Sequence, residues 1–209
     1  MSLTRVSLEP PYLLYLADVA DDDHAKTGHG IAYWRAEHCA GQMRLAECPV
    51  DLGLTDMSVA DAVDAGVRTA IIGVAPVGGQ IPDHWLPNLI ELAKAGISIA
   101  SGMHSKLRSM PDLVAAAFKG GANLTDVRLP PANIPVGQGK PRSGKRVLMI
   151  GTDCAVGKKY TALALHRELE RRDIKTTFRA TGQTGIMIAG EGIPIDAVVA
   201  DFISGAAEA

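Results

Sequence analysis

The segment from Arg146 to Thr161 places the strongest constraint on how this chain can fold. It begins with the apolar residues 147–150, which predict a short buried strand, and continues through a loop bounded by Gly151 and Gly157. Lys158 follows the second glycine and opens a predicted helix. A strand, a glycine-bounded loop and a helix in this order form a phosphate cradle, because loop N–H groups and the helix dipole converge on one point. The segment therefore predicts a phosphate-bearing ligand.

This loop departs from the usual phosphate loop at the position that binds metal. In the pattern G-x-x-x-x-G-K-[ST] the last hydroxyl holds Mg²⁺. Here one additional residue lies between the glycines, and Lys159 occupies the hydroxyl position. The loop is similar to the modified loop of dethiobiotin synthetase-like P-loop proteins. A cation at this position would repel a metal ion, so we expect no metal site, and Mg²⁺-dependent nucleotide hydrolysis is less expected than phosphate binding alone. A strand-to-helix turn without a ligand is the alternative.

The composition is that of a globular protein with a substantial core. The 209 residues are 47% hydrophobic and 21% charged. A net charge of −2 gives no electrostatic basis for binding nucleic acid, so we expect no nucleic-acid partner. No apolar run reaches the length of a membrane span, so we expect no membrane association. The three cysteines lack paired spacing, which favours reduced thiols and a cytoplasmic location.

Predicted strands and helices alternate over residues 1–128, which indicates an α/β, Rossmann-like domain with a parallel sheet. The expected strands span residues 11–18, 41–45, 69–74, 97–101 and 123–128, and the expected helices span residues 24–35, 58–65, 82–95 and 113–119. We expect Ser58 to cap the second helix and Gly66 to end it.

Residues 129–145 contain four prolines and three glycines and predict a linker. Residues 146–209 then predict the start of a P-loop NTPase-like α/β domain. It would contain a helix at 160–172, a strand at 175–180, a second Gly/Thr-rich loop at 181–185, and an apolar segment at 195–202 that suits either strand or helix. Two or three strands are too few to bury such a sheet. We therefore expect an incomplete domain, finished by a longer chain or by a partner, and a homo-oligomer is expected because an unfinished sheet edge tends to pair.

Ligands of parallel sheets bind beyond the carboxyl ends of the strands. There the sequence places Asp18 and His104 as candidate catalytic groups. Candidate substrate-binding residues are Lys26, Thr27, Arg35, Ser101 and Arg128. Each has a structural alternative: Asp18 as a capping carboxylate, His104 as a surface histidine, and the arginines as solvated or packed side chains.

Several stretches together resemble the D-glutamate N-acetyltransferase family, long catalogued as a P-loop family of unknown function. They cover residues 11–16, 25–27, 30–31, 34–35, 51–54 and 101–104, and the two loops Gly-Thr-Asp-Cys-Ala-Val-Gly-Lys (151–158) and Arg-Ala-Thr-Gly-Gln-Thr-Gly (179–185). The resemblance spans the whole chain in order. It implies an N-terminal Rossmann-like domain, a C-terminal P-loop domain, and family members longer than this chain.

The resemblance also implies transfer of an acetyl group from acetyl-CoA to the amine of a small-molecule substrate, D-glutamate. CoA phosphates need no Mg²⁺, which fits Lys159 in place of a hydroxyl. The expected CoA-binding residues are Gly151, Thr152, Asp153, Cys154, Ala155, Val156, Gly157, Lys158, Lys159, Tyr160, Thr161, Thr181, Gly182 and Gln183. Lys26 or Arg35 would hold the substrate carboxylates at a domain interface, with His104 or Asp18 near the amine. The alternatives are an Mg-ATP-dependent ligase or kinase, and a nucleotide-binding module without catalysis.

Overall fold

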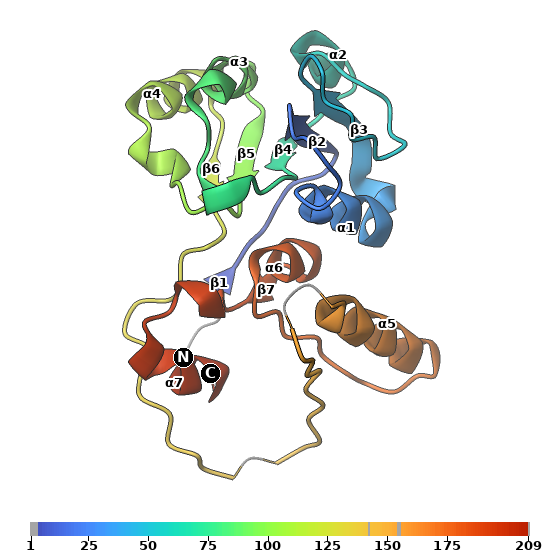
Figure 1. Cartoon of the computed structure of the whole chain (residues 1–209), viewed down its shortest axis with the longest axis vertical. Coiled ribbons are helices and arrows are strands. Elements are labelled where there is room, and N and C mark those ends of the chain that lie inside the picture. Colours follow the sequence, from blue (N-terminus) through green and yellow to red (C-terminus); the bar gives the residue numbers. More distant parts are fainter. Residues whose placement is uncertain (1–3, 142, 154–155, 209) are drawn as a thin grey trace. The chain divides into compact units, whose positions relative to one another are not determined.

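The computed structural model describes residues 4–141, 143–153 and 156–208 (Figure 1). The chain folds into two compact units. One comprises Val6–Leu129, and the other combines Pro130 onward with Thr4 and Arg5. The sequence had placed residues 1–128 in one domain, so these N-terminal residues lie in a different unit from the one predicted. Below, Val6–Leu129 is called the N-terminal unit and the remainder the C-terminal unit.

A five-stranded parallel sheet forms the centre of the N-terminal unit. Its strands are β2 (Tyr12–Ala17), β3 (Cys39–Arg44), β4 (Thr69–Ile72), β5 (Ser98–Ser101) and β6 (Leu124–Asp126), in the spatial order β3-β2-β4-β5-β6. All residues of β2 and β4 are buried, as expected for strands covered on both faces. The chain moves to one side of β2 first and then to the other. The topological switch point, where open α/β sheets bind ligands, therefore lies between β2 and β4.

The helices of the N-terminal unit cover both faces of this sheet. α2 (Val59–Asp64), α3 (Leu86–Lys94) and α4 (Pro111–Gly120) share one face, and α1 (Lys26–Trp34) covers the other (Figure 1). Short 3₁₀ turns are η1 (Ala36–His38), η2 (Val77–Gly79), η3 (Asp83–Trp85) and η4 (Leu107–Ser109). Ser58 caps α2 in a capping box with Asp61, and Gly66 follows with a φ of 69°. The predicted start and end of this helix are thus confirmed.

The C-terminal unit is mainly helical in its described part. It contains α5 (Lys158–Arg171), α6 (Gln183–Ala189) and α7 (Ile203–Glu208), with 3₁₀ turns η5 (Ile195–Ala197) and η6 (Ala200–Phe202). A two-stranded antiparallel sheet pairs β1 (Thr4–Arg5) with β7 (Glu191–Gly192). The segment 195–202, ambiguous from sequence, forms the two 3₁₀ turns. No helix among the described residues is long and apolar enough to cross a membrane.

Two strands predicted for the C-terminal unit are not formed. Residues 146–150 have no regular structure, and Val147, Leu148 and Ile150 are 71%, 80% and 84% exposed. The strand predicted at 175–180 is reduced to one bridge between Ala180 and Gly192. A strand is stabilised by hydrogen bonds to a neighbouring strand. Among the described residues, 146–150 pair with none, and the segment 175–180 pairs only at Ala180. The sequence of these two segments alone was therefore insufficient to predict strands.

Part of the predicted linker packs against α7. The N–H groups of Gln138 and Gly139 donate to the carboxylate of Glu208 at 2.8 and 2.6 Å. Gly205 of α7 lies so close to Pro135 that a Cβ atom there would be 1.6 Å from the Pro135 carbonyl oxygen. Residues 135–139 are therefore ordered by interactions within the C-terminal unit, while Lys140, Lys145 and Arg146 are exposed.

Candidate functional site

Val156 and Lys158, at the end of the phosphate loop, pack closely on its first glycine, Gly151. Gly157 caps α5 in the left-handed region with a φ of 96°, a conformation that favours glycine. A Cβ atom at Gly151 would lie 2.8 Å from Val156 Cγ2 and 3.2 Å from Lys158 Cδ. Lys158 Nζ donates to the carbonyl oxygen of Asp153. Both glycines of the motif are therefore required by the geometry, and the Lys158 ammonium lies over the loop, where phosphate loops hold phosphate.

The other described residues predicted for this loop precede or begin α5. Thr152, Asp153 and Val156 are exposed, whereas Cys154 and Ala155 fall outside the described residues. Thr161 Oγ1 donates to the carbonyl oxygen of Gly157 at 3.2 Å. The Thr161 hydroxyl, two residues after the position of the metal-binding hydroxyl in the usual motif, is thus hydrogen-bonded within the helix.

Lys159 extends in a different direction from Lys158. Its Nζ atom lies 4.2 Å from the centroid of the Tyr160 ring, a cation–π contact. Burial lowers the pKa of Lys159 to about 8. Its Cδ atom would be 3.7 Å from a Cβ atom at Gly185, in ordinary van der Waals contact. Lys159 therefore connects the start of α5 to α6.

The second predicted loop is shorter than expected, because helix α6 begins within it. Thr181 and Gly182 remain outside the helix, whereas Gln183 is its first residue. Gly182 is extended and caps α6, and Thr181 accepts a backbone hydrogen bond from Ile195 at 3.1 Å. The contact between Lys159 and Gly185 brings the two segments predicted to bind CoA side by side within the C-terminal unit.

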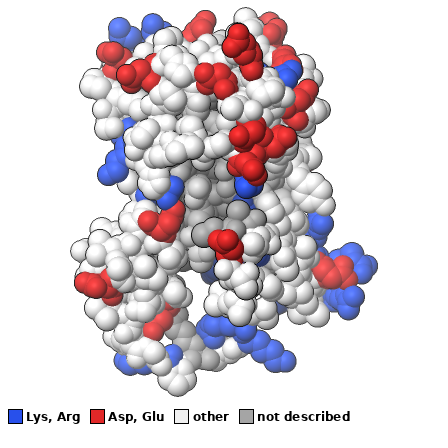
Figure 2. Space-filling model, viewed as in Figure 1, with Lys and Arg blue, Asp and Glu red and all other residues white. Residues whose placement is uncertain are grey.

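Charge is distributed unequally between the units. The N-terminal unit has 9 Lys and Arg against 15 Asp and Glu, a formal charge of −6, whereas the C-terminal unit has 12 against 8, a charge of +4. Figure 2 shows the acidic residues gathered on the N-terminal unit in this view. A basic unit attracts anionic ligands, so the sign of the charge agrees with phosphate binding at the loop before α5.

The carboxylate of Asp18 lies at the carboxyl edge of the sheet and is held by two side-chain hydrogen bonds. It follows β2 and accepts hydrogen bonds from Trp85 Nε1 at 2.6 Å and from His84 Nε2 at 2.7 Å. Burial raises the pKa of this carboxyl group, but the hydrogen bonds from Trp85 and His84 outweigh burial and hold the pKa below its ordinary value. Asp18 is therefore an ionised, anchored carboxylate that orients the imidazole of His84.

Ser101 is the last residue of β5, and His104 lies in the loop that follows, which is hydrogen-bonded to the loop after β4. The His104 N–H donates to the Gly79 carbonyl oxygen at 2.8 Å, and a Cβ atom at Gly79 would be 2.4 Å from His104 Cδ2. Ser105 Oγ donates to Gln80 Oε1 at 2.6 Å. The buried Ser101 hydroxyl accepts from the N–H of Met103 at 3.1 Å. His104 is exposed and packs on a glycine, and among the described residues it has no carboxylate partner of the kind that His84 has.

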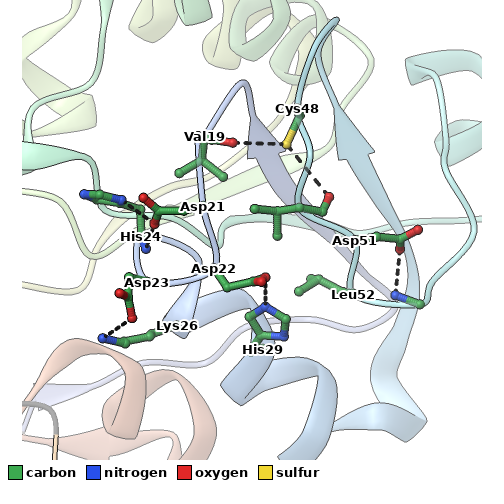
Figure 3. Close-up of polar contacts among 12 residues, drawn as sticks. Val19, Asp21, Asp22, Asp23, His24, Lys26, His29, Cys48, Asp51 and Leu52 are labelled. Carbon is green, nitrogen blue, oxygen red and sulfur yellow. Dashed lines mark hydrogen bonds and ion pairs between the residues drawn. The ribbon is translucent and has the colours of Figure 1, made fainter.

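Lys26 and Thr27 lie at the start of α1, after a loop of three aspartates (Figure 3). Asp23 pairs with Lys26 Nζ at 2.9 Å. The other two aspartates pair with histidines, Asp21 with His24 at 2.7 Å and Asp22 with His29 at 2.8 Å. Thr27 is buried, and the next residue, Gly28, donates its N–H to the Gly73 carbonyl oxygen at 2.7 Å. This loop is therefore folded onto the switch point between β2 and β4.

The two predicted arginines occupy different edges of the sheet. Arg35 follows the last residue of α1 and precedes β3, so it lies at the amino edge, at the opposite end of α1 from Lys26. Arg128 follows β6 at the carboxyl edge, where Asp126 accepts the N–H of Leu107 at 2.8 Å. The structure therefore brings Asp18, Lys26, Thr27, Ser101, His104 and Arg128 to one edge of the sheet and leaves Arg35 at the other.

Sequence reasoning missed His84. This residue lies 66 positions after Asp18, in the 3₁₀ turn that precedes α3. The sequence indicates its position only weakly, because it shows merely a polar residue between a buried strand and an amphipathic helix. Its role becomes visible only when parallel pairing of β2 with β4 brings the segments after both strands to the same edge.

Two domain models account for most of the chain. A Rossmann-like domain of unknown function, DUF1611_N, matches residues 39–130, and a P-loop domain of unknown function, DUF1611_C, matches residues 135–209. The chain belongs to the DUF1611 family. The predicted pairing of a Rossmann-like domain with a P-loop domain is thereby confirmed.

Relatives of this DUF1611 chain include two curated proteins named D-glutamate N-acetyltransferase. The protein from Tritonibacter scottomollicae is 50% identical over 96% of this chain, and that from a Pseudoalteromonas species is 43% identical over 97%. The chain spans 60% and 61% of the length of these proteins. A crystal structure of a DUF1611 family protein from Anabaena variabilis matches 95% of this chain and 60% of its own, with a TM-score of 0.82 at 32% identity.

The geometry of Asp18 predicts how stability depends on pH. Because the pKa of this carboxyl group is lowered in the folded protein, its contribution is present above the ordinary pKa of about 3.9 and is lost as the pH falls through the folded-state value. We expect Asp18→Asn to destabilise the N-terminal unit at pH 7, and we expect the difference from wild type to shrink as the pH is lowered below the ordinary pKa of about 3.9. Urea unfolding followed by tryptophan fluorescence measures this, since Trp34 and Trp85 both lie in that unit.

Asp64→Asn is the matched control, because Asp64 is an exposed carboxylate on α2 of the same unit. A pH-independent difference between wild type and Asp18→Asn would contradict the anchoring role of the ionised carboxylate.

Proposed function

We propose that the protein transfers the acetyl group of acetyl-CoA to the amine of D-glutamate. The observation that carries this proposal is the identity of 50% and 43%, over almost the whole chain, to proteins named D-glutamate N-acetyltransferase. The closed phosphate loop, the basic C-terminal unit and the anchored histidine at the carboxyl edge supply parts that such a reaction needs.

The loop before α5 is suited to CoA phosphates. Phosphate loops bind through backbone N–H groups, a helix N-terminus and a lysine, and all three lie together at Gly157 and Lys158. The metal-binding hydroxyl of the usual motif is replaced by Lys159, and the hydroxyl of Thr161 is bonded to its own helix. In the proposed complex Lys158 leaves the Asp153 carbonyl oxygen and contacts phosphate oxygens. CoA phosphates require no bridging metal ion, in contrast to the usual substrates of Mg²⁺-dependent P-loop enzymes.

His84 is the candidate general base of this reaction. When Nε2 donates to Asp18, Nδ1 retains a lone pair, and no described residue hydrogen-bonds to it. The base takes one proton from the substrate ammonium, and the free amine attacks the thioester carbonyl carbon. The C–N bond forms, the C–S bond breaks, and CoA leaves as the thiol after protonation. Acetyl-CoA supplies the activated acetyl group, while Asp18 keeps the imidazole oriented.

The carboxylates of D-glutamate would be held at the same edge of the sheet. Lys26 already pairs with a carboxylate, Asp23, and both side chains are more than half exposed. Such an exposed pair contributes only about 0–1 kcal/mol, so a substrate carboxylate can replace Asp23 at little cost. Thr27, Ser101 and Arg128 lie at this edge and are the further candidate contacts, with His104 beside them. Arg35, at the opposite edge, is not part of this proposal.

The role of the loop predicts the effect of Lys158→Ala on cofactor binding. Titration calorimetry of acetyl-CoA in metal-free buffer should show an affinity reduced about tenfold or more, because a charge-assisted contact to phosphate is lost. Lys175→Ala is the matched control, since Lys175 is an exposed lysine of the same unit. Unchanged affinity in Lys158→Ala would remove the loop from the CoA site.

If His84 is the general base, replacing it should reduce catalysis and leave binding of the substrates intact. In the protein as its gene encodes it, His84→Gln should lower kcat for D-glutamate acetylation about 100-fold or more, the usual contribution of a general base. His104→Gln tests the candidate predicted from sequence and should have a much smaller effect. If His104→Gln abolished turnover while His84→Gln did not, His104 would be the base.

A further inference from the structure

Two consecutive lysines begin α5, and their side chains leave the helix in different directions. Successive residues of an α-helix are about 100° apart around its axis. Lys158 turns back over the loop, with its Cδ atom near Gly151 and its Nζ atom on the Asp153 carbonyl oxygen. Lys159 instead lies between the Tyr160 ring and Gly185 of α6. The Lys159 side chain therefore points away from a phosphate group that is bound by Lys158.

Lys159 has no anionic partner among the described residues. It makes no hydrogen bond or ion pair there, and its described polar contact is with the Tyr160 ring. Several carboxylates of the C-terminal unit are engaged elsewhere: Glu168 with Arg171 and Arg172, Glu191 with Arg179, and Glu208 with backbone N–H groups. A half-buried ammonium without a counter-charge is costly, and a ligand anion would remove that cost.

We propose that Lys159 binds a second anionic group of the ligand, separate from the one at Lys158, and that in CoA this group is the 3′-phosphate. CoA carries two separated anionic groups, a diphosphate on the ribose 5′ carbon and a phosphate on the 3′ carbon. ATP carries a single continuous triphosphate chain. Two ammonium groups pointing in different directions from one helix terminus match the first arrangement. Lys159 is then a specificity-determining residue, and this inference rests on the proposed use of acetyl-CoA.

Burial of the Lys159 stem supports this assignment. The pKa of Lys159 is lowered to about 8 because burial disfavours the charged ammonium. A phosphate at this position would favour the charged form and offset that penalty. Gly185 has no side chain, so it lets the lysine stem lie against α6 without displacing it.

Titration calorimetry with acetyl-CoA and with 3′-dephospho-acetyl-CoA tests the proposal directly. Wild type should bind acetyl-CoA about tenfold or more tightly than the dephospho form, as one charge-assisted contact provides. In Lys159→Met the two affinities should become nearly equal, because only binding of the 3′-phosphate is lost. In Lys158→Met both affinities should fall by a similar factor, which preserves the ratio.

The outcomes separate this inference from the proposed function. If wild type shows no preference, or if Lys159→Met retains the wild-type ratio, Lys159 does not bind the 3′-phosphate, although acetyl-CoA remains the ligand. If wild type binds neither compound, both the inference and the proposed cofactor are overturned. Lys159→Gln is the second variant, and unaltered affinity for the dephospho form in either variant shows that the site remains folded.

Discussion

Main-chain hydrogen bonding of β2 to both of its neighbours is the constraint on which the N-terminal unit depends. β2 pairs in parallel with β3 and with β4, for example Leu14 with Gln42 and with Ile71. Parallel pairing aligns the carboxyl ends of the strands, so the residues that follow them gather at one edge. Asp18, the α1 entry loop and the turn bearing His84 meet there for this reason. The hydrogen bond between Gly28 and Gly73, two residues without side chains, allows α1 to approach the end of β4 closely.

In the C-terminal unit, the phosphate loop depends on the glycines around the start of α5. Gly157 supplies the left-handed turn into the helix, and Gly151 leaves room for Lys158 above the loop. The charge of +4 on this unit and −6 on the other means that an anionic cofactor is attracted to the unit that holds the phosphate loop. The chemistry proposed for the carboxyl edge of the N-terminal sheet uses His84 as the base and Asp18 as the carboxylate that orients it.

The sequence was a good guide where structure is decided locally or by burial. The strands around Leu13 and Ile71 and the helix capped by Ser58 were predicted, because apolar runs, capping residues and glycines act within a few positions. The segment 146–150 was predicted as a strand on the same evidence and forms none, because a strand also needs a hydrogen-bonded neighbour. In the candidate site, too, the residue decided locally was predicted and the residue placed by distant pairing was missed. Asp18 was predicted from the end of its own strand, whereas His84 becomes its partner through pairing across 66 positions.

Thermal stability in the presence of nucleotides tests most directly the claim that the phosphate loop serves CoA without a metal ion. Wild-type protein would be heated with acetyl-CoA or ATP, each in buffer containing Mg²⁺ or EDTA. The account predicts that acetyl-CoA raises the Tm equally in both buffers, because its phosphates are held by lysines and backbone N–H groups alone. Stabilisation by ATP that requires Mg²⁺, with none by acetyl-CoA, would contradict it and indicate a ligase or kinase.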